Sequence, residues 1–270
     1  MSAWQMEQVT QTRWLRVRLG GLTWRLLGGA DTAGLRPYLV RPAALLLPPA
    51  KLLKTASVQS PCEVAQFTLR GVAVPPLVIK HYREPRFLGR LKDLARGPRA
   101  WRAARWAMVL GELEVPAIGP VAAGARWWQP WDSYLVTRWL EPTCAFHKYM
   151  AAHARSLERR PVFDALAQLL ARLHDAGISH GDAHWGNFVL QLKPTPTLIM
   201  VDLDGLRRIG RITAARAGRD LQRLLHWTPA TAAEQMRFLV RYCQKRRQPV
   251  KVRELLAMVK IHYARAERGG

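Results

Sequence analysis

Apolar and polar positions alternate in short stretches over the first part of the chain, as they do in the strands of a sheet. Two Trp-bearing stretches, residues 14–19 and 22–27, are separated by Gly20 and Gly21, a pair typical of a β-hairpin turn. Three further strands are predicted upstream of residue 84, divided by turn-forming residues at 57–61 and 71–76. These strands cover residues 51–54, 63–70 and 77–82.

Further along the chain, apolar residues recur mostly at the spacing typical of helices rather than of strands. The clearest helix covers residues 161–176, where large apolar residues recur at helical spacing and Gly177 supplies a C-terminal stop. A strand hairpin follows, made of residues 188–192 and 197–202, with a Pro-containing turn at 193–196. Other helices are predicted from Pro98 to before Pro116 and over residues 218–227, 231–244 and 250–264. A strand-rich first part and a helix-rich second part predict an α+β protein of two lobes, joined through a strand at 134–140.

Charge is the unusual part of the composition. The chain has 42 Lys plus Arg against 19 Asp plus Glu, a formal net charge of +23. Such a field attracts nucleic acid, anionic membrane surfaces or phosphorylated substrates, although a genome rich in Arg codons would account for part of the excess. Residues 83–105 concentrate it, with eight basic residues against Glu84 and Asp93. A merely solvated basic helix is the plainer interpretation of that segment.

The cysteines and the hydropathy of the chain indicate the cellular compartment in which we expect the protein. Cys62, Cys144 and Cys243 are far apart and odd in number, so they predict neither a disulfide framework nor a zinc site and suit a reducing cytoplasm. Residues 1–10 are polar, unlike a signal peptide, and the apolar run at 43–53 is interrupted by prolines and too short to cross a bilayer. We therefore expect a soluble or peripheral protein.

The strongest chemical signal is the segment HGDAHWGN at residues 180–187, with an apolar run ending at Asp202 shortly after it. An Asp, an Asn five residues later and a second Asp at a strand end are the groups that phosphoryl transfer needs. Asp182 would accept the proton of the attacking hydroxyl, while Asn187 and Asp202 would hold Mg²⁺ on the phosphates of ATP. The protein-kinase version of this motif has Arg where this chain has Gly181.

Each of these residues also has an ordinary structural interpretation. Asp182 could cap a turn, and Asn187 could be a turn residue before a strand. Asp204 could share the role of Asp202 or form a structural ion pair, and we favour Asp202. The pair His180 and His184 is weak support for zinc, because a third ligand is missing and Gly181 indicates a loop.

Lys80 is the candidate for binding the ATP phosphates. It ends the strand-like run Pro-Leu-Val-Ile, which mirrors the Val-Ala-Ile-Lys pattern of kinases. A Lys at a strand end is more often simply solvated, but its place upstream of the Asp-containing loop favours a functional role.

Taken together, these motifs resemble the bacterial lipopolysaccharide kinase family, which includes InaA-type proteins, core heptose kinases and Kdo kinases on a protein-kinase-like fold. The resemblance rests on Val-Ile-Lys80, the stretch from residue 174 through the loop to Phe188, and Val-Asp202-Leu-Asp204. Segments 219–224 and 237–242 also resemble the family's C-terminal helices.

The family resemblance implies a β-rich ATP-binding lobe at residues 1–140 and a helical catalytic lobe at 141–270. It implies Lys80 for ATP, Asp182 as the base, and Asn187 with Asp202 for Mg²⁺. Two features depart from kinases. Residues 55–60 contain no G-x-G-x-x-G loop, and the helix after Lys80 has no central Glu, only Glu112 and Glu114 at its end.

The implied activity is ATP- and Mg²⁺-dependent phosphorylation of a heptose or Kdo hydroxyl in the lipopolysaccharide inner core. Because that acceptor is anionic and membrane-borne, the basic surface suits a cytoplasmic protein at the periphery of the inner membrane. We expect no specific nucleic-acid partner. The alternatives are a kinase for protein or another small alcohol, and a membrane-associated pseudokinase that acts as a scaffold.

Overall fold

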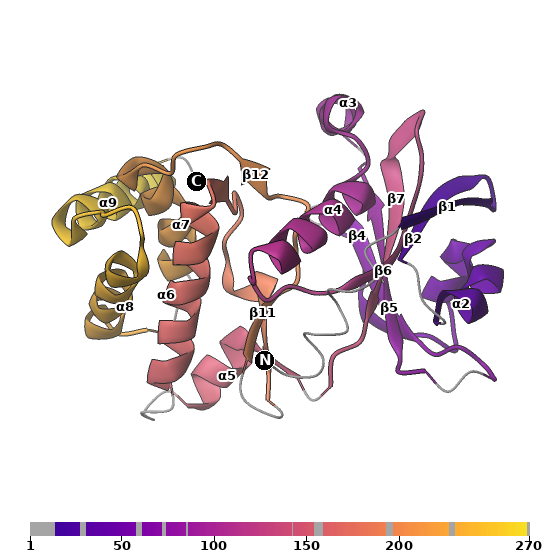
Figure 1. The fold of residues 1–270 in the computed structure, drawn as a ribbon, viewed down its shortest axis with the longest axis horizontal. Coiled ribbons are helices and arrows are strands. Elements are labelled where there is room, and N and C mark those ends of the chain that lie inside the picture. Colours follow the sequence, from indigo (N-terminus) through magenta and orange to yellow (C-terminus); the bar gives the residue numbers. More distant parts are fainter. Residues whose placement is uncertain are drawn as a thin grey trace. The chain divides into compact units, whose positions relative to one another are not determined.

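The computed structural model describes most of the 270-residue chain. The described residues are 14–27, 31–57, 61–71, 74–84, 86–141, 143–153, 159–192, 197–226 and 230–268. The chain forms two compact units (Figure 1). The first comprises Met1–Gly111 and Ile118–Trp139, and the second comprises Glu112–Ala117 and Leu140–Gly270.

The first unit is built on a seven-stranded antiparallel sheet, in the order β1-β2-β6-β7-β5-β4-β3. Its strands are β1 (Trp14–Leu19), β2 (Leu22–Leu27), β3 (Lys51–Lys54), β4 (Cys62–Phe67), β5 (Leu77–Arg83), β6 (Pro120–Arg126) and β7 (Gln129–Arg138). The predicted hairpin of β1 and β2 is confirmed, and its Gly20 and Gly21 both adopt positive φ angles. Strands β3, β4 and β5 are also confirmed, although β4 ends three residues earlier than predicted.

Strand β6 is absent from the sequence-based prediction, because its residues PVAAGAR are mostly small and carry a weak strand signal. Its position requires small residues. A Cβ on Gly124 would lie 2.6 Å from the ring of Trp24 on the paired strand β2. The predicted strand at 134–140 is the second half of the longer β7, which starts directly after the turn at Trp127 and Trp128.

Helices cover both faces of this sheet (Figure 1). On one face, helix α2 (Asp31–Leu39) and the 3-10 turn η1 (Pro42–Leu46) enclose a core that includes Trp24, Ile79 and Val136. On the other face lies α4 (Arg99–Glu112), the helix predicted after Pro98. Trp101 of α4 donates from Nε1 to the Ala123 carbonyl at 3.2 Å. A further helix, α3 (Phe87–Arg96), lies between β5 and α4 in the chain and was predicted only as a basic segment.

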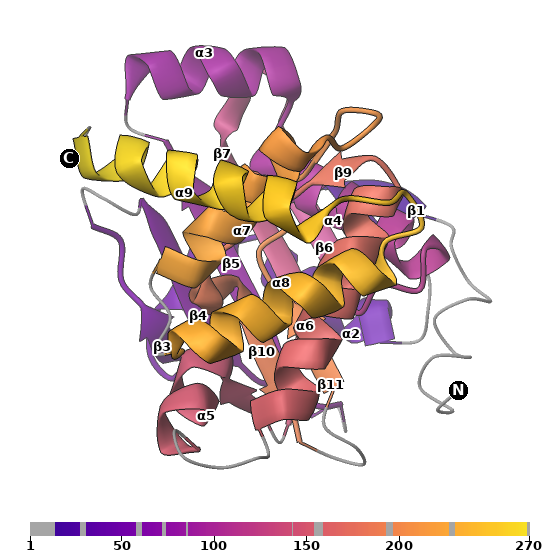
Figure 2. The same cartoon turned by 90° about the vertical axis from the view of Figure 1, so that its left-hand side faces the viewer.

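The second unit is mostly helical. Its helices are α5 (Phe146–Ala152), α6 (Arg159–Asp175), α7 (Ala214–His226), α8 (Ala232–Lys245) and α9 (Val252–Arg268). The long helices α6 to α9 match the predicted ones to within a few residues at each end. Helix α8 packs against α6, and α9 packs against α7 (Figure 2).

Two small sheets complete the second unit. One has the order β11-β10-β8, from β8 (Thr143–Ala145), β10 (Phe188–Gln191) and β11 (Thr197–Met200). The other pairs β9 (Ile178–Ser179) with β12 (Arg207–Arg208). The predicted hairpin is thus confirmed as β10 and β11, while its turn at 193–196 lies outside the described residues. So do residues 1–10, taken above as unlike a signal peptide, and parts of the turns predicted at 57–61 and 71–76.

Candidate active site

The loop that carries Asp182 is held in place by a buried carboxylate from helix α7. Asp220 accepts hydrogen bonds from the Ser179 hydroxyl at 2.8 Å and from the backbone N–H groups of His180 at 2.9 Å and Gly181 at 3.1 Å. Because one side chain binds three consecutive residues, it fixes the path of the chain just before Asp182.

Gly181 is required by this path. It has a φ of +74°, where side chains are strained, and a Cβ there would lie 3.2 Å from the Gly205 carbonyl oxygen. The Arg found at this position of the protein-kinase motif would therefore be strained in this loop.

A chain of hydrogen bonds continues from Asp220 through the second unit. His174 Nε2 lies 3.3 Å from Asp220, and its Nδ1 lies 2.6 Å from the Tyr242 hydroxyl. Arg246 donates to the Tyr242 hydroxyl and, from Nε at 2.7 Å, to Asp175. Tyr242, which accepts from Arg246, can donate to His174 Nδ1, and His174 Nε2 can donate to Asp220.

Electrostatics favour the ionised form of Asp220. Burial alone would raise the pKa of this carboxyl, but the hydrogen bonds and charges of its partners, led by His174 and then Ser179, lower it to about 2. Burial raises the pKa of the neighbouring Tyr242 hydroxyl, so it remains a neutral donor.

Asp182 contrasts with Asp220 because its carboxylate is accessible, with 58% of the side chain exposed. Arg223, one turn after Asp220 on α7, donates to Asp182 Oδ1 at 3.0 Å and to the Gly181 carbonyl at 2.7 Å. His184 Nε2 lies 3.7 Å from Oδ2, which is too far for a hydrogen bond. Arg223 therefore holds one carboxylate oxygen, and the other remains accessible to an acceptor hydroxyl.

Asn187 links Asp182 to the strand hairpin. Its side-chain Nδ2 donates to the Asp182 carbonyl at 2.8 Å, and its backbone carbonyl accepts from Val201 N–H at 3.0 Å. Asp202, the residue after Val201, is partly exposed two residues beyond the end of β11, whereas Asp204 is buried. The structure thus joins Asp182 to Asn187 directly, and Asn187 to Val201, the residue before Asp202.

The two histidines of the loop have different surroundings. The His180 ring is buried beside Phe188, and neither ring nitrogen has a hydrogen-bond partner within the described part of the chain. Burial lowers its pKa, so the ring is neutral. His184 caps the 3-10 turn η2 (Trp185–Asn187) by accepting from Gly186 N–H at 3.1 Å. Among the described residues, no group of three or more His, Cys, Asp or Glu side chains is placed to hold a metal.

Lys80 lies in the first unit, on strand β5 between Val64 of β4 and Leu135 of β7. Its Nζ is 4.7 Å from the centre of the Tyr82 ring, and the Arg99 guanidinium is 4.9 Å from the same ring. Glu112, one of the two Glu residues at the end of the helix after Lys80, ends α4 and is assigned to the second unit.

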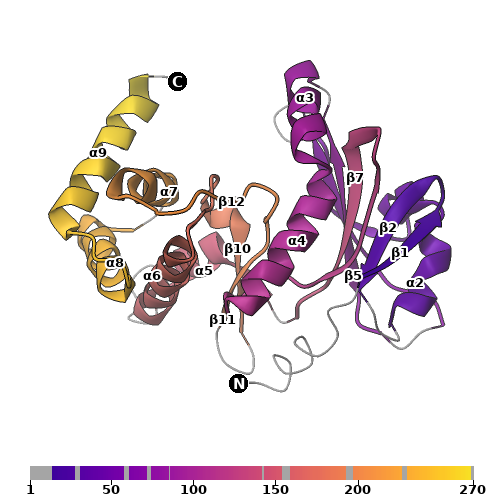
Figure 3. The ribbon, with the colours of Figure 1, turned by 45° about the horizontal axis from the view of Figure 1, so that its top comes forward.

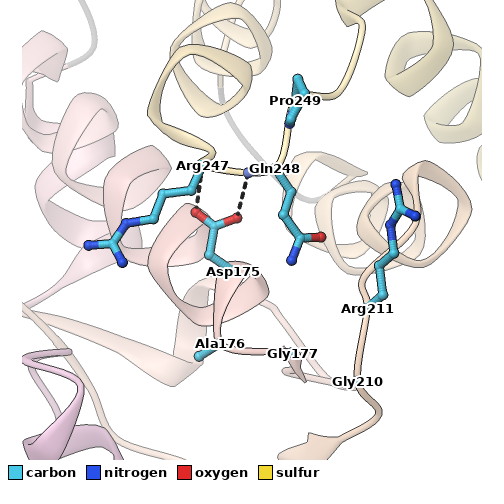
Figure 4. A pocket seen from close by; sticks show the side chains of 8 residues that line it. All are labelled: Asp175, Ala176, Gly177, Gly210, Arg211, Arg247, Gln248 and Pro249. Atoms are coloured by element: carbon cyan, nitrogen blue, oxygen red, sulfur yellow. Dashed lines mark hydrogen bonds between the residues drawn. The ribbon is translucent and has the colours of Figure 1, made fainter.

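The second unit also has an open cavity of about 560 Å³ at the end of α6 (Figure 4). Asp175 dominates it, accepting from Arg247 N–H at 2.8 Å and Gln248 N–H at 3.4 Å. Asp182, Asn187 and Asp202 do not line this cavity, so it is separate from the candidate active site.

Sequence reasoning missed Asp220 and Arg223, which it treated only as parts of a helix. One signal was available. Asp220 falls at helical spacing with Ala217, Leu221 and Leu224, all of them buried, so a carboxylate stands on the apolar face of α7. A buried carboxylate on the apolar face of a helix indicates that hydrogen-bond donors from another part of the chain satisfy it.

Comparisons with known proteins bear on the family and the fold. Residues 76–242 match the model of the lipopolysaccharide kinase (Kdo/WaaP) family. A solved structure of WaaP in complex with acyl carrier protein resembles this chain with a TM-score of 0.57 at 22% identity, over 81% of this chain and 88% of that one. A comparison with curated protein sequences gives no match.

WaaP has a protein-kinase-like fold, so the predicted fold class is confirmed. The family match spans more than half of the chain and includes both Lys80 and the loop of Asp182. This chain belongs to the lipopolysaccharide kinase (Kdo/WaaP) family and is a kinase that transfers a phosphoryl group to an alcohol acceptor.

Proposed function

We propose that the protein transfers the γ-phosphoryl group of ATP, with Mg²⁺, to a heptose or Kdo hydroxyl of the lipopolysaccharide inner core. In a chain of this family, the observation that carries the proposal is the pair of hydrogen bonds that link Asn187 to Asp182 and to Val201, the residue before Asp202. A carboxylate and an amide next to a second carboxylate are the groups that phosphoryl transfer uses.

Asp182 would orient the acceptor hydroxyl and take its proton. Its exposure gives an acceptor access to Oδ2, and Arg223 fixes the carboxylate through Oδ1. A positioned carboxylate of this kind contributes about 10²–10⁴-fold to a proton transfer.

Asn187 and Asp202 would hold Mg²⁺. The residues fit the ion, because the amide nitrogen of Asn187 is engaged with the Asp182 carbonyl and its oxygen is the hard ligand that Mg²⁺ prefers. Two protein oxygens are a normal complement for Mg²⁺, which takes its remaining ligands from water and phosphates. The bound ion would neutralise charge that develops on the phosphates.

Lys80 would neutralise the phosphates of ATP from the first unit. Its strand pairs with neighbours on both sides, which gives the side chain a rigid base. We accordingly assign ATP binding to residues 1–140 and catalysis to residues 141–270.

The net charge of +23 supports an anionic acceptor at a membrane. We propose that the protein is cytoplasmic and peripheral at the inner membrane, with no specific nucleic-acid partner. Within the part of the chain that the structure describes, no helix meets the length and hydropathy needed to span a bilayer.

A thermal shift assay with Mg-ATP tests nucleotide binding. We expect Mg-ATP to raise the melting temperature of the wild type and to raise it much less for Asp202→Ala. Asp164→Ala is the matched control, since Asp164 is a surface carboxylate of the same unit that pairs with Arg241 at 3.5 Å. If the wild type does not respond to Mg-ATP, the catalytic proposal fails and the scaffold gains support.

Mass spectrometry of lipid A–core from a strain without the gene tests the acceptor. We expect the loss of one phosphate, restored by the wild-type gene and not by the Asp182→Ala gene. An unchanged core would point to a different alcohol as acceptor.

A further inference from the structure

Helix α3 is amphipathic, but its apolar side faces outward. Phe87, Leu88, Leu91 and Leu94 are exposed by 71%, 78%, 46% and 52%. The one fully buried position of the helix is a charged residue, Asp93. A helix of a globular domain normally turns its leucines inward, so this orientation needs a reason.

The polar side of α3 is what attaches it to the first unit. Asp93 and Arg102 of α4 form a buried ion pair at 3.0 Å. Arg90 donates from Nε to the Glu84 carbonyl at 3.0 Å and lies over the ring of Trp131. Because these contacts fix the rotation of the helix, the leucines are held away from the protein.

Two exposed tryptophans lie at the same end of the first unit. Trp127 and Trp128 form the turn between β6 and β7, with exposures of 71% and 56%. Helix α3 contacts β7, and Glu84, three residues before the helix begins, donates from N–H to the Trp131 carbonyl at 3.0 Å. Figures 1 and 3 show α3 and the start of β7 together at this end.

Basic residues also lie on or next to α3. At helical spacing Lys92 borders the apolar side, Arg86 and Arg96 lie toward the side of Asp93, and Asp93, the acid within the helix, is buried in its ion pair. Residues 83–105, which the sequence predicted as a concentrated basic segment, therefore do not form one continuous exposed patch. Arg102 belongs to the interior, and Arg99 lies over Tyr82.

From this surface we infer that α3, with the turn of Trp127 and Trp128, is an interfacial anchor for an anionic lipid bilayer. Leucine and phenylalanine enter the boundary of the acyl chains, tryptophan occupies the headgroup region, and basic side chains bind lipid phosphates. We choose a lipid bilayer as the binding partner because the basic side chains of this surface complement anionic lipid headgroups. The inference rests on the proposed function only because that function places the acceptor in a membrane.

Vesicle flotation with the full chain tests the anchor. We expect the wild type to float with vesicles that contain phosphatidylglycerol, and to float less with pure phosphatidylcholine or at high salt. The double variant Leu88→Gln, Leu91→Gln should lose about tenfold or more in apparent affinity. The control Leu52→Gln, Leu53→Gln changes two other exposed leucines of the same unit, on β3, and should bind as the wild type does.

Equal binding of the α3 variant and the wild type would overturn the inference, as would no flotation of the wild type. A concentration-dependent dimer that the α3 variant abolishes, without flotation, would show a second copy of the chain as the occupant and would also overturn it. The two proposals fail separately. Asp202→Ala should float normally while losing phosphoryl transfer, and an active protein that does not float would refute only the anchor.

Discussion

Each unit contains a buried histidine that bridges two polar partners close to a candidate site residue, but the two bridges differ. In the first unit, His81 follows Lys80 and faces Glu63 Oε2 at 3.3 Å and Asp132 Oδ1 at 2.7 Å. In the second unit, His174 faces the Tyr242 hydroxyl and Asp220. The His81 ring thus has a carboxylate acceptor on each side, whereas the His174 ring has a hydroxyl that can donate on one side and a carboxylate acceptor on the other.

The difference shows what each bridge fixes. His81 ties three neighbouring strands, since Glu63, His81 and Tyr134 are paired across β4, β5 and β7, and its ring stacks on Tyr134 at 4.2 Å. Burial and the charge of Asp132 raise the pKa of Tyr134 to about 12. His174 instead supports Asp220, which holds a loop by its backbone. His81 adds side-chain contacts to a sheet whose strands are already paired, whereas His174 supports a carboxylate that holds a loop together with Arg223 and Asn187.

Asp220→Ala is expected to have the largest effect. It removes a buried carboxylate and leaves three loop donors and His174 without their acceptor, at a cost of about 3–5 kcal/mol in the free energy of unfolding. Phosphoryl transfer should fall by about 100-fold or more, because Asp182 depends on this loop. Urea unfolding and a kinase assay measure the two effects, with Asp164→Ala as control. Normal activity would show that the loop holds its shape without Asp220.

His81→Ala is expected to rank second. It removes the ring between Glu63 and Asp132 and its stacking on Tyr134, which should cost about 2–3 kcal/mol. Because the sheet remains paired, we expect the change in activity to appear mainly in KM for ATP, through Lys80. Glu63→Gln is the milder control, since Glu63 is partly exposed and makes the longer of the two bonds. If kcat fell further in His81→Ala than in Asp220→Ala, the bridge of the first unit would matter more for catalysis than that of the second.

The two regions also differ in how far the sequence predicted them. The spacing of Asp182 and Asn187 and the hairpin before Asp202 depend on residues near in sequence, so local patterns could predict the loop and the hairpin, while the roles of the three residues stay predictions. Asp220 acts on residues about forty positions upstream, so no local pattern assigns its role. Strand β6 escaped prediction because packing against Trp24 selects small residues there. The reversed face of α3 could not be predicted, because contacts of Asp93 and Arg90 with residues outside the helix decide which side turns inward.

His180 gives a pH-dependent test of the second region. Burial lowers the pKa of its ring below the unfolded value near 6.5, so the unfolded chain takes up the proton first as the pH falls. The wild type should therefore lose up to about 1.4 kcal/mol of stability per pH unit below about 6.5 from this group, until the folded-state pKa is reached. His180→Leu should remove that slope, whereas His147→Asn, at an exposed position, should keep it. Unfolding curves from pH 7 to 5 measure it, and parallel curves for wild type and His180→Leu would contradict it.

Arg223→Gln is expected to have the smallest effect on stability and a selective effect on catalysis. The guanidinium and the Asp182 carboxylate are 41% and 58% exposed, and an exposed pair of this kind contributes less than about 1 kcal/mol. Its loss should nevertheless free Asp182 to rotate, so that kcat falls by about tenfold while KM for ATP stays near the wild-type value. Arg223→Lys should recover only part of kcat, because an ammonium does not reproduce the two bonds of the guanidinium to Gly181 and Asp182. Full activity in Arg223→Gln would mean that Asp220 alone positions the loop, and the second region would then resemble the first in depending on one buried bridge.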